Sequence, residues 1–266
     1  MEAAPRAPLS TITVNGARIE LVDRGCGRPI LFLHPHIGLD PSAPVLAMLA
    51  QGGRLIAPSH PGFGHSERPA GLTTVDDLAY FYLDLIDELD LRDTLVIGVS
   101  LGAWIAAAIA VKSTARMACL VFGNPVGIKV GDRETRDILD IFAMVEDEFL
   151  KKAFADATVG KRDYRAMTDD EIMVAARNRE AAALYAWSPY MHDPKLKGRL
   201  HRIRIPALVL WGTADRLVGE AYGRTFAAAV PGAKFETIVD AGHFPHIERP
   251  KDFAARALAF RMTDVG

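Results

Sequence analysis

Short apolar runs alternate along the chain with longer segments in which apolar residues recur every three or four positions. The short runs predict buried strands, whereas the longer spacing predicts amphipathic helices that pack on a sheet. The strands are expected at residues 29–33, 54–57, 94–99, 117–122, 207–210 and 234–239, and the helices at 74–91, 101–111, 219–229 and 251–262. Such alternation of strand and helix predicts an α/β fold with a mostly parallel, doubly wound sheet.

The first strands are expected to form a hairpin. Residues 11–14 and 18–22 alternate in polarity and are joined across Asn15-Gly16, a dipeptide typical of two-residue turns. With this hairpin the sheet has eight strands. The helix at 74–91 has its own start signal, because Thr74 is followed three residues later by Asp77, as in a capping box.

The alternation stops between residues 125 and 203. Apolar residues at helical spacing predict a helix within 134–154, and Thr168 with Glu171 forms a second capping box that opens a helix toward Trp187. The segment leaves one parallel strand and returns before the next, so it should lie over the carboxyl ends of the strands. We therefore expect a core domain of residues 1–124 and 204–266 with an inserted helical lid, 125–203, that sets substrate choice.

Composition narrows the class of protein further. The 266 residues are 50% hydrophobic, which is enough for one large core, and the net charge of −2 gives no field that would attract nucleic acid. Cys26 and Cys119 do not make a disulfide framework, which fits a reducing compartment. The first ten residues lack the apolar region of a leader, and no run approaches the about 18 apolar residues of a membrane span. We expect a cytoplasmic protein.

A serine lies where a predicted strand passes into a predicted helix. Residues 98–102 read Gly-Val-Ser-Leu-Gly, between the apolar run 94–99 and an alanine-rich helical segment. This is the setting in which Gly-x-Ser-x-Gly forms a nucleophile elbow, a strained turn that presents a serine hydroxyl at a strand end. A side chain at Gly98 or Gly102 would crowd the neighbouring backbone. We therefore predict that Ser100 is a nucleophile.

A serine nucleophile needs a base and a carboxylate that orients the base, and both follow later strands. Asp215 comes shortly after the strand 207–210 and His243 shortly after 234–239, which gives the chain order Ser, Asp, His. Asp240 is the competing carboxylate, but it is too close to His243 in sequence to approach it from a separate strand end. His246 is the competing base, and we expect it to be structural.

With these motifs the chain resembles the α/β-hydrolase family over nearly its whole length. Residues 31–38, Leu-Phe-Leu-His-Pro-His-Ile-Gly, and residues 61–66, Pro-Gly-Phe-Gly-His-Ser, resemble two further loops of that family. The resemblance implies that the backbone N–H groups of His36 and Leu101 form an oxyanion hole. Two positions depart from the usual pattern, since Pro35 replaces a glycine and Ser59 replaces an aspartate.

The pair His34 and His36 raises the question of a metal. No cysteine or carboxylate cluster accompanies the pair, so we predict no metal, and no glycine-rich loop indicates a nucleotide cofactor. We expect His34 to brace the oxyanion loop, and the side chain of His36 is a candidate for contact with substrate. The other expected substrate-binding residues are apolar: Phe142, Trp187, Met191, Leu217 and Phe244.

The resemblance implies a serine esterase that acts on small to medium ester substrates through an acyl-enzyme, without a cofactor. Hydrolysis of a carbon–carbon bond in vinylogous diketones is the alternative, although relatives with that activity differ at the positions of Val99 and Leu101. A lactonase remains open, as does a hydrolase-fold receptor that binds its ligand without efficient turnover. The sequence leaves the oligomeric state open.

Overall fold

The computed structural model describes residues 9–132 and 134–263, which form an eight-stranded sheet with helices on both faces. The strand order is β1-β2-β4-β3-β5-β6-β7-β8, and every neighbouring pair from β4 to β8 is parallel. The strands are β1 (Ser10–Val14), β2 (Ala17–Arg24), β3 (Pro29–Leu33), β4 (Arg54–Pro58), β5 (Thr94–Val99), β6 (Met117–Gly123), β7 (Ala207–Gly212) and β8 (Lys234–Ile238). The predicted fold class is confirmed.

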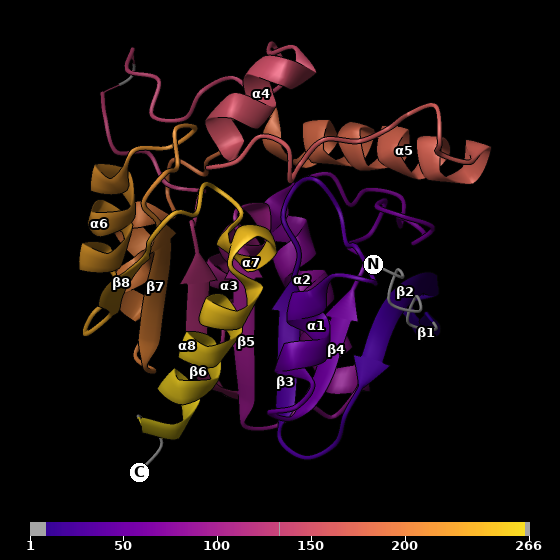
Figure 1. Ribbon diagram of the computed structural model, residues 1–266. Coiled ribbons are helices and arrows are strands. Elements are labelled where there is room, and N and C mark those ends of the chain that lie inside the picture. The colour runs from indigo at the N-terminus through magenta and orange to yellow at the C-terminus, as the bar shows by residue number, and fades with distance from the viewer. Residues whose placement is uncertain (1–8, 133, 264–266) are drawn as a thin grey trace.

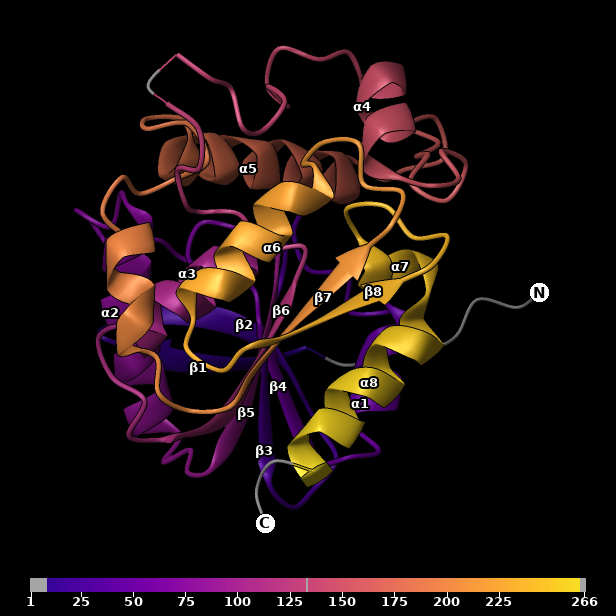
Figure 2. The ribbon, with the colours of Figure 1, turned by 90° about the vertical axis from the view of Figure 1, so that its left-hand side faces the viewer.

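Helices cover the two faces of the sheet and enclose two apolar layers (Figure 2). On one face lie α2 (Val75–Glu88), α3 (Leu101–Ala110) and α6 (Glu220–Ala229). On the other lie α1 (Pro44–Leu49) and α8 (Pro250–Thr263), with α7 (Pro245–Glu248) preceding α8. The short α1 and α7 lack the length that makes helical spacing visible, and the sequence did not predict them.

The two local signals near the amino terminus are confirmed. Asn15 and Gly16 both have positive φ, 51° and 78°, as a two-residue hairpin turn requires, and β1 pairs antiparallel with β2. Thr74 caps α2 with its hydroxyl oxygen accepting from the Asp77 N–H, while the Asp77 carboxylate accepts from the Thr74 N–H. Both signals act within a few residues, which is why they are legible in the sequence.

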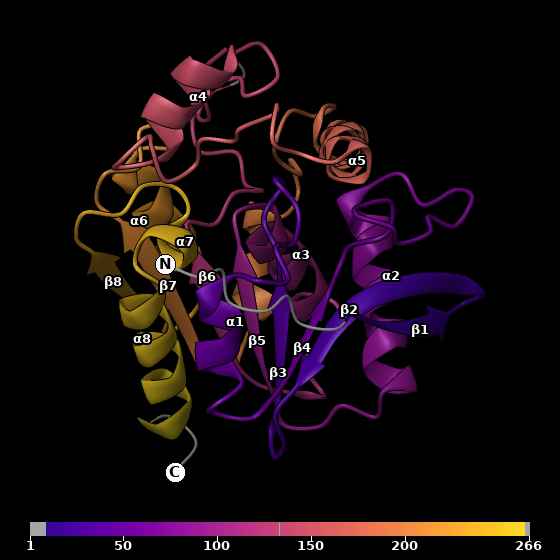
Figure 3. The same ribbon diagram turned by 45° about the vertical axis from the view of Figure 1, so that its right-hand side comes forward.

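The segment 125–203 crosses the carboxyl ends of the strands, where α4 (Glu146–Ala153) and α5 (Asp169–Ala186) lie above the sheet (Figures 1 and 3). A short 3₁₀ helix (Lys197–Arg202) returns the chain to β7. The capping box of α5 forms as predicted, with the Thr168 hydroxyl accepting from the Glu171 N–H. Among the described residues, no helix is long and apolar enough to cross a membrane.

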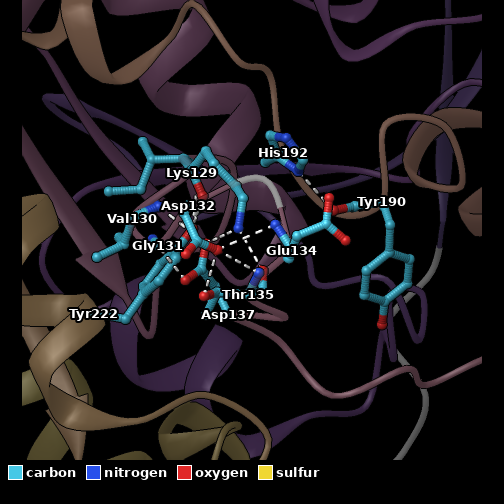
Figure 4. A network of polar contacts seen from close by, with 11 residues as sticks. Lys129, Val130, Gly131, Asp132, Glu134, Thr135, Asp137, Tyr190, His192 and Tyr222 are labelled. Atoms are coloured by element: carbon cyan, nitrogen blue, oxygen red, sulfur yellow. Dashed lines mark hydrogen bonds and ion pairs between the residues drawn. The ribbon is translucent and has the colours of Figure 1, made fainter.

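The helix predicted within 134–154 is wrong for its first half, since only residues 146–153 are helical. Asp137 accepts hydrogen bonds from the N–H groups of Val130 and Gly131 and pairs with Lys129 at 2.9 Å (Figure 4). Asp140 likewise accepts from the two N–H groups that follow Ile141. These carboxylates satisfy the backbone locally and so compete with helix formation.

Three side chains of α5 fasten it to the loop 61–66 of the core. The Tyr185 hydroxyl donates to the Pro61 carbonyl at 2.9 Å, and Arg177 donates to the Ser66 carbonyl at 3.2 Å. The Asn178 amide oxygen accepts from the Gly64 N–H at 2.8 Å. The segment 125–203 thus forms a cover that these contacts hold in a defined position over the strand ends.

Candidate active site

Ser100 occupies the turn between β5 and α3 with φ +53°, a backbone conformation that side-chain-bearing residues rarely adopt. The two flanking glycines permit this turn. A Cβ on Gly98 would lie 2.3 Å from the Gly102 carbonyl oxygen, and a Cβ on Gly102 would lie 2.0 Å from the Leu33 oxygen. The serine N–H is anchored to the Gly123 carbonyl at 2.9 Å. The strained turn is thus fixed by its neighbours on β3 and β6.

Asp215 follows β7, and backbone and side-chain donors hold its carboxylate. One oxygen, Oδ1, accepts from the N–H groups of Leu217 at 2.9 Å and Val218 at 3.1 Å. The other, Oδ2, accepts from the Asn124 amide at 2.8 Å. Asn124 follows β6 and also accepts from the Gly212 N–H at 3.0 Å, so it links two strand ends. Sequence reasoning missed Asn124, although a polar residue directly after a buried strand was the available signal.

His243 connects Asp215 and Ser100 through the two nitrogens of its ring. Its Nδ1 lies 2.7 Å from Asp215 Oδ2, and its Nε2 lies 2.8 Å from Ser100 Oγ. Both ring atoms are buried, and the His243 N–H donates to the Ala153 carbonyl at 2.7 Å, which ties this loop to the end of α4. The structure therefore brings together three residues that are 143 positions apart at the extremes.

The competing residues lie elsewhere. The Asp240 carboxylate is 75% exposed and faces Arg249 at 3.7 Å. His246 is buried beside Phe32 and Phe253, and burial, followed by the nearby His243, lowers its pKa to about 3. Its ring is consequently neutral and packs as an aromatic residue.

The loop after β3 approaches Ser100 through His36. The His36 Nδ1 lies 3.3 Å from Ser100 Oγ, and burial, then the neighbouring His243, lowers the His36 pKa to about 3. Within the described parts of the chain, the backbone N–H groups of His36 and Leu101 have no protein acceptor. Leu101 opens α3, where the helix dipole favours negative charge. Both groups are available to an external oxygen.

His34 lies behind this loop and does not face the same ligand as His36. Its Nε2 accepts from the His60 N–H at 2.9 Å, so its Nδ1–H donates to the Pro35 carbonyl at 2.7 Å. His60 returns a hydrogen bond from Nε2 to the His34 carbonyl at 2.9 Å and contacts the Tyr82 hydroxyl through Nδ1. Residues 9–132 and 134–263 contain no cluster of His, Cys, Asp or Glu that could hold a metal.

A cavity of about 420 Å³ lies between the core and the cover, and His36 and Ile37 line it from the core side. Most of its lining is apolar, and the cover contributes most of it. The lining includes Ile37, Ile141, Phe142, Met144, Phe149, Leu150, Phe154, Tyr164, Ile172 and Ala182, with the polar residues Glu146, Arg162, Asn178 and Arg179. Its size and character suit a small organic molecule.

Of the five predicted substrate-binding residues, only Phe142 lines this cavity. Phe244 packs behind the site, with its ring 5.1 Å from that of His243 and 5.6 Å from that of His36. Met191 and Leu217 are buried in the apolar core, at 1% and 3% exposure. Trp187 is 56% exposed and lines a separate cavity of about 340 Å³. These four residues do not line the cavity. Their apolar character predicts that they pack against other residues, but it does not predict which space they face.

Comparison with known proteins places the chain in a family. Residues 30–256 match the model of the alpha/beta hydrolase family, and the chain belongs to that family. It is 28% identical over 254 residues to a dihydrolipoyllysine-residue acetyltransferase component of an acetoin cleaving system from Cupriavidus necator. That match covers 91% of this chain but only 66% of that longer protein.

Two further similarities are to a curated hydrolase and to a solved structure. A 2-hydroxymuconate semialdehyde hydrolase from Pseudomonas sp. is 25% identical, with 92% of this chain and 90% of that protein covered. The solved structure of a thermophilic esterase from Thermogutta terrifontis superposes with a TM-score of 0.71 at 22% identity, covering 98% of this chain and 100% of the other. The second likeness, at 22% identity, is one of fold.

Proposed function

We propose that this protein is a serine hydrolase of the carboxylesterase type, which cleaves esters of small to medium molecules through an acyl-enzyme intermediate. Ser100 is the nucleophile, His243 the general base and Asp215 the residue that orients the base. The observation that carries the proposal is the unbroken line of short hydrogen bonds from Asp215 through His243 to Ser100, at 2.7 and 2.8 Å.

The geometry supports the following sequence of steps. Ser100 Oγ attacks the ester carbonyl carbon while its proton moves to His243 Nε2, and Asp215 stabilises the imidazolium that forms. The carbonyl oxygen takes up the negative charge and accepts from the N–H groups of His36 and Leu101. The alcohol leaves with the proton from His243, and a water molecule repeats the sequence on the acyl-enzyme.

The cover supports a role in substrate choice. The segment 125–203 supplies most of the cavity lining, and Phe142 and Phe149 stand on its inner side. An apolar cavity of about 420 Å³ favours acyl or alcohol groups of moderate size over polymers. We therefore treat 125–203 as a lid that selects the substrate, while the core carries the chemistry.

The test uses Ser100→Ala with Ser113→Ala as a control. Alanine retains the fold at the elbow as well as serine does, because both bear a Cβ at the same positive φ. Purified Ser100→Ala should lose turnover of p-nitrophenyl butyrate and labelling by a fluorophosphonate, whereas Ser113→Ala, which lies outside the site, should keep both. Ester turnover retained by folded Ser100→Ala would exclude the proposal.

A second candidate is hydrolysis of a carbon–carbon bond within a vinylogous diketone substrate that carries a carboxylate. It is supported by the similarity to a 2-hydroxymuconate semialdehyde hydrolase and by two guanidinium groups, Arg162 and Arg179, that line the cavity. Steady-state turnover of matched esters, lactones and vinylogous diketones separates these reactions. Fluorophosphonate labelling without turnover of any of them would instead favour a ligand-binding receptor.

A further inference from the structure

The proposed mechanism uses the backbone of His36 but leaves its imidazole without a role. The residue is only 6% exposed, lines the cavity and contacts the nucleophile, with its Nδ1 3.3 Å from Ser100 Oγ. Ser100 itself is fully buried and does not line the cavity. His36 is thus a lining residue of the cavity that also contacts the nucleophile.

The hydrogen bonds of the site determine where the His36 proton resides. The Asp215 carboxylate only accepts, so His243 Nδ1 carries a proton and His243 Nε2 accepts from the Ser100 hydroxyl. Ser100 has only one proton to donate. Its contact with His36 must then have the serine oxygen as acceptor and the His36 Nδ1–H as donor.

The other ring nitrogen supports the same tautomer. His36 Nε2 is buried and has no hydrogen-bond partner among the described residues. A proton there would be an unsatisfied buried donor, which is rarer in proteins than an unsatisfied acceptor. Burial and the nearby His243 keep the His36 pKa near 3, so the ring is neutral and carries its single proton on Nδ1.

We infer that the Nδ1–H of His36 is a third donor to the oxyanion, so that the side chain is a catalytic group beside the two backbone N–H groups. When the bond from Ser100 Oγ to the carbonyl carbon forms, the Ser100 proton passes to His243 Nε2 and the π electron pair moves onto the carbonyl oxygen. That oxygen is bonded to the carbon that Oγ attacks, so it lies next to the atom that the His36 Nδ1–H already contacts. His36 transfers no proton in this step.

The sequence of the loop after β3 favours a side-chain donor at His36. Pro35 has no N–H, so the residue before His36 cannot supply a backbone donor to the oxyanion. A neutral imidazole is suited to the task, because it polarises a carbonyl oxygen without giving up its proton. This inference rests on the proposed esterase function and adds a donor to it.

The test compares His36→Phe with His36→Asn. Phenylalanine keeps a ring but removes the donor, whereas the asparagine amide nitrogen can occupy nearly the position of Nδ1. We expect His36→Phe to lower kcat for p-nitrophenyl butyrate by about 100-fold, as for the loss of one oxyanion donor, with little change in KM. His36→Asn should recover most of that loss. A trifluoromethyl ketone, which mimics the tetrahedral adduct, should bind His36→Phe more weakly by a similar factor.

Phe149→Leu is the matched control, because Phe149 packs edge-on against the His36 ring at 6.0 Å and lines the same cavity without a polar atom. It should alter KM more than kcat. Wild-type kcat in His36→Phe, or an equal loss in His36→Asn and His36→Phe, would overturn the inference. If His36→Phe does not fold, His36→Leu replaces it in the same comparison. Either result leaves the esterase proposal intact as long as Ser100→Ala is inactive.

Discussion

The core and the segment 125–203 solve different physical problems. In the core, parallel strands bring Ser100, Asp215 and His243 to one edge, and backbone contacts fix each of them. The cover contacts the core through side-chain hydrogen bonds, such as those of Asn178 and Tyr185, and through backbone hydrogen bonds at the ends of its segments, and apolar residues line its inner side. We infer that the core is built for one chemistry and the cover for a choice of substrate.

The largest effect on the core side is expected from Asp215→Asn. The amide cannot hold His243 in the tautomer whose Nε2 accepts the serine proton, so kcat should fall by about 10⁴-fold with little change in KM. Steady-state kinetics with p-nitrophenyl butyrate measures this. Asp240→Asn, at an exposed position, is the control, and comparable losses in the two variants would contradict a specific role of Asp215 in orienting His243.

The next largest effect is expected on stability, when a methyl group is added at a glycine of the nucleophile elbow. A Cβ at residue 102 would lie 2.0 Å from the Leu33 carbonyl oxygen, so Gly102→Ala should destabilise the fold by about 3 kcal/mol. Gly198→Ala is the matched control, since nothing lies within 4 Å of a Cβ there. Urea unfolding monitored by tryptophan fluorescence gives both values, and equal midpoints would remove the steric account of the elbow.

The buried histidines predict how stability depends on pH. Burial lowers the pKa of His36, His60 and His246 to about 3, from an ordinary value of 6.5. The unfolded chain therefore binds more protons between these values, so stability is full above pH 6.5 and falls as the pH drops toward 3. Each of these histidines should lower the free energy of unfolding by up to about 1.4 kcal/mol for each pH unit that the pH falls within that window.

Urea unfolding at pH 7.5 and 5.5 tests this dependence. His246→Phe replaces one buried imidazole with a ring that cannot bind a proton. The free energy of unfolding should then depend less steeply on pH. His201→Gln, at an exposed position, should leave it unchanged. A free energy of unfolding that does not change between the two pH values would contradict the burial of neutral histidines.

The smallest effect is expected in the cover. Asn178→Ala removes the acceptor for the Gly64 N–H and loosens α5 over the cavity. A cost of about 1 kcal/mol in the position of the cover corresponds to about a 5-fold rise in KM, with kcat little changed. Glu180→Ala, on the exposed side of α5, is the control. A fall in kcat without a change in KM would mean that the cover contributes to the chemistry.

The sequence predicts the core well because its signals are local or repetitive. Buried strands and helical spacing predict the sheet, and the order of Ser100, Asp215 and His243 predicts that three strand ends converge. The predicted strand bounds differ from the observed ones by at most two residues. The family resemblance agrees with the match over residues 30–256. The carboxyl ends of parallel strands lie at the same end of the sheet, and this holds for any loop structure.

The cover is less predictable, because its structure depends on individual side-chain contacts that the apolar spacing does not reveal. Asp137 and Asp140 satisfy backbone groups and prevent the helix that the apolar spacing favours. The apolar character of Trp187 does not reveal that it faces a different cavity from Phe142. The contact between His36 and Ser100 joins residues 64 positions apart, and only their placement in three dimensions reveals it.

The most direct test of the central claim is to look for the acyl-enzyme. Rapid acid quenching of the wild-type protein during turnover of p-nitrophenyl butyrate, followed by mass spectrometry of its peptides, should find a butyryl group on Ser100, and Ser100→Ala should carry none. Turnover without any acylated peptide, or with the acyl group on a residue other than Ser100, would contradict the account.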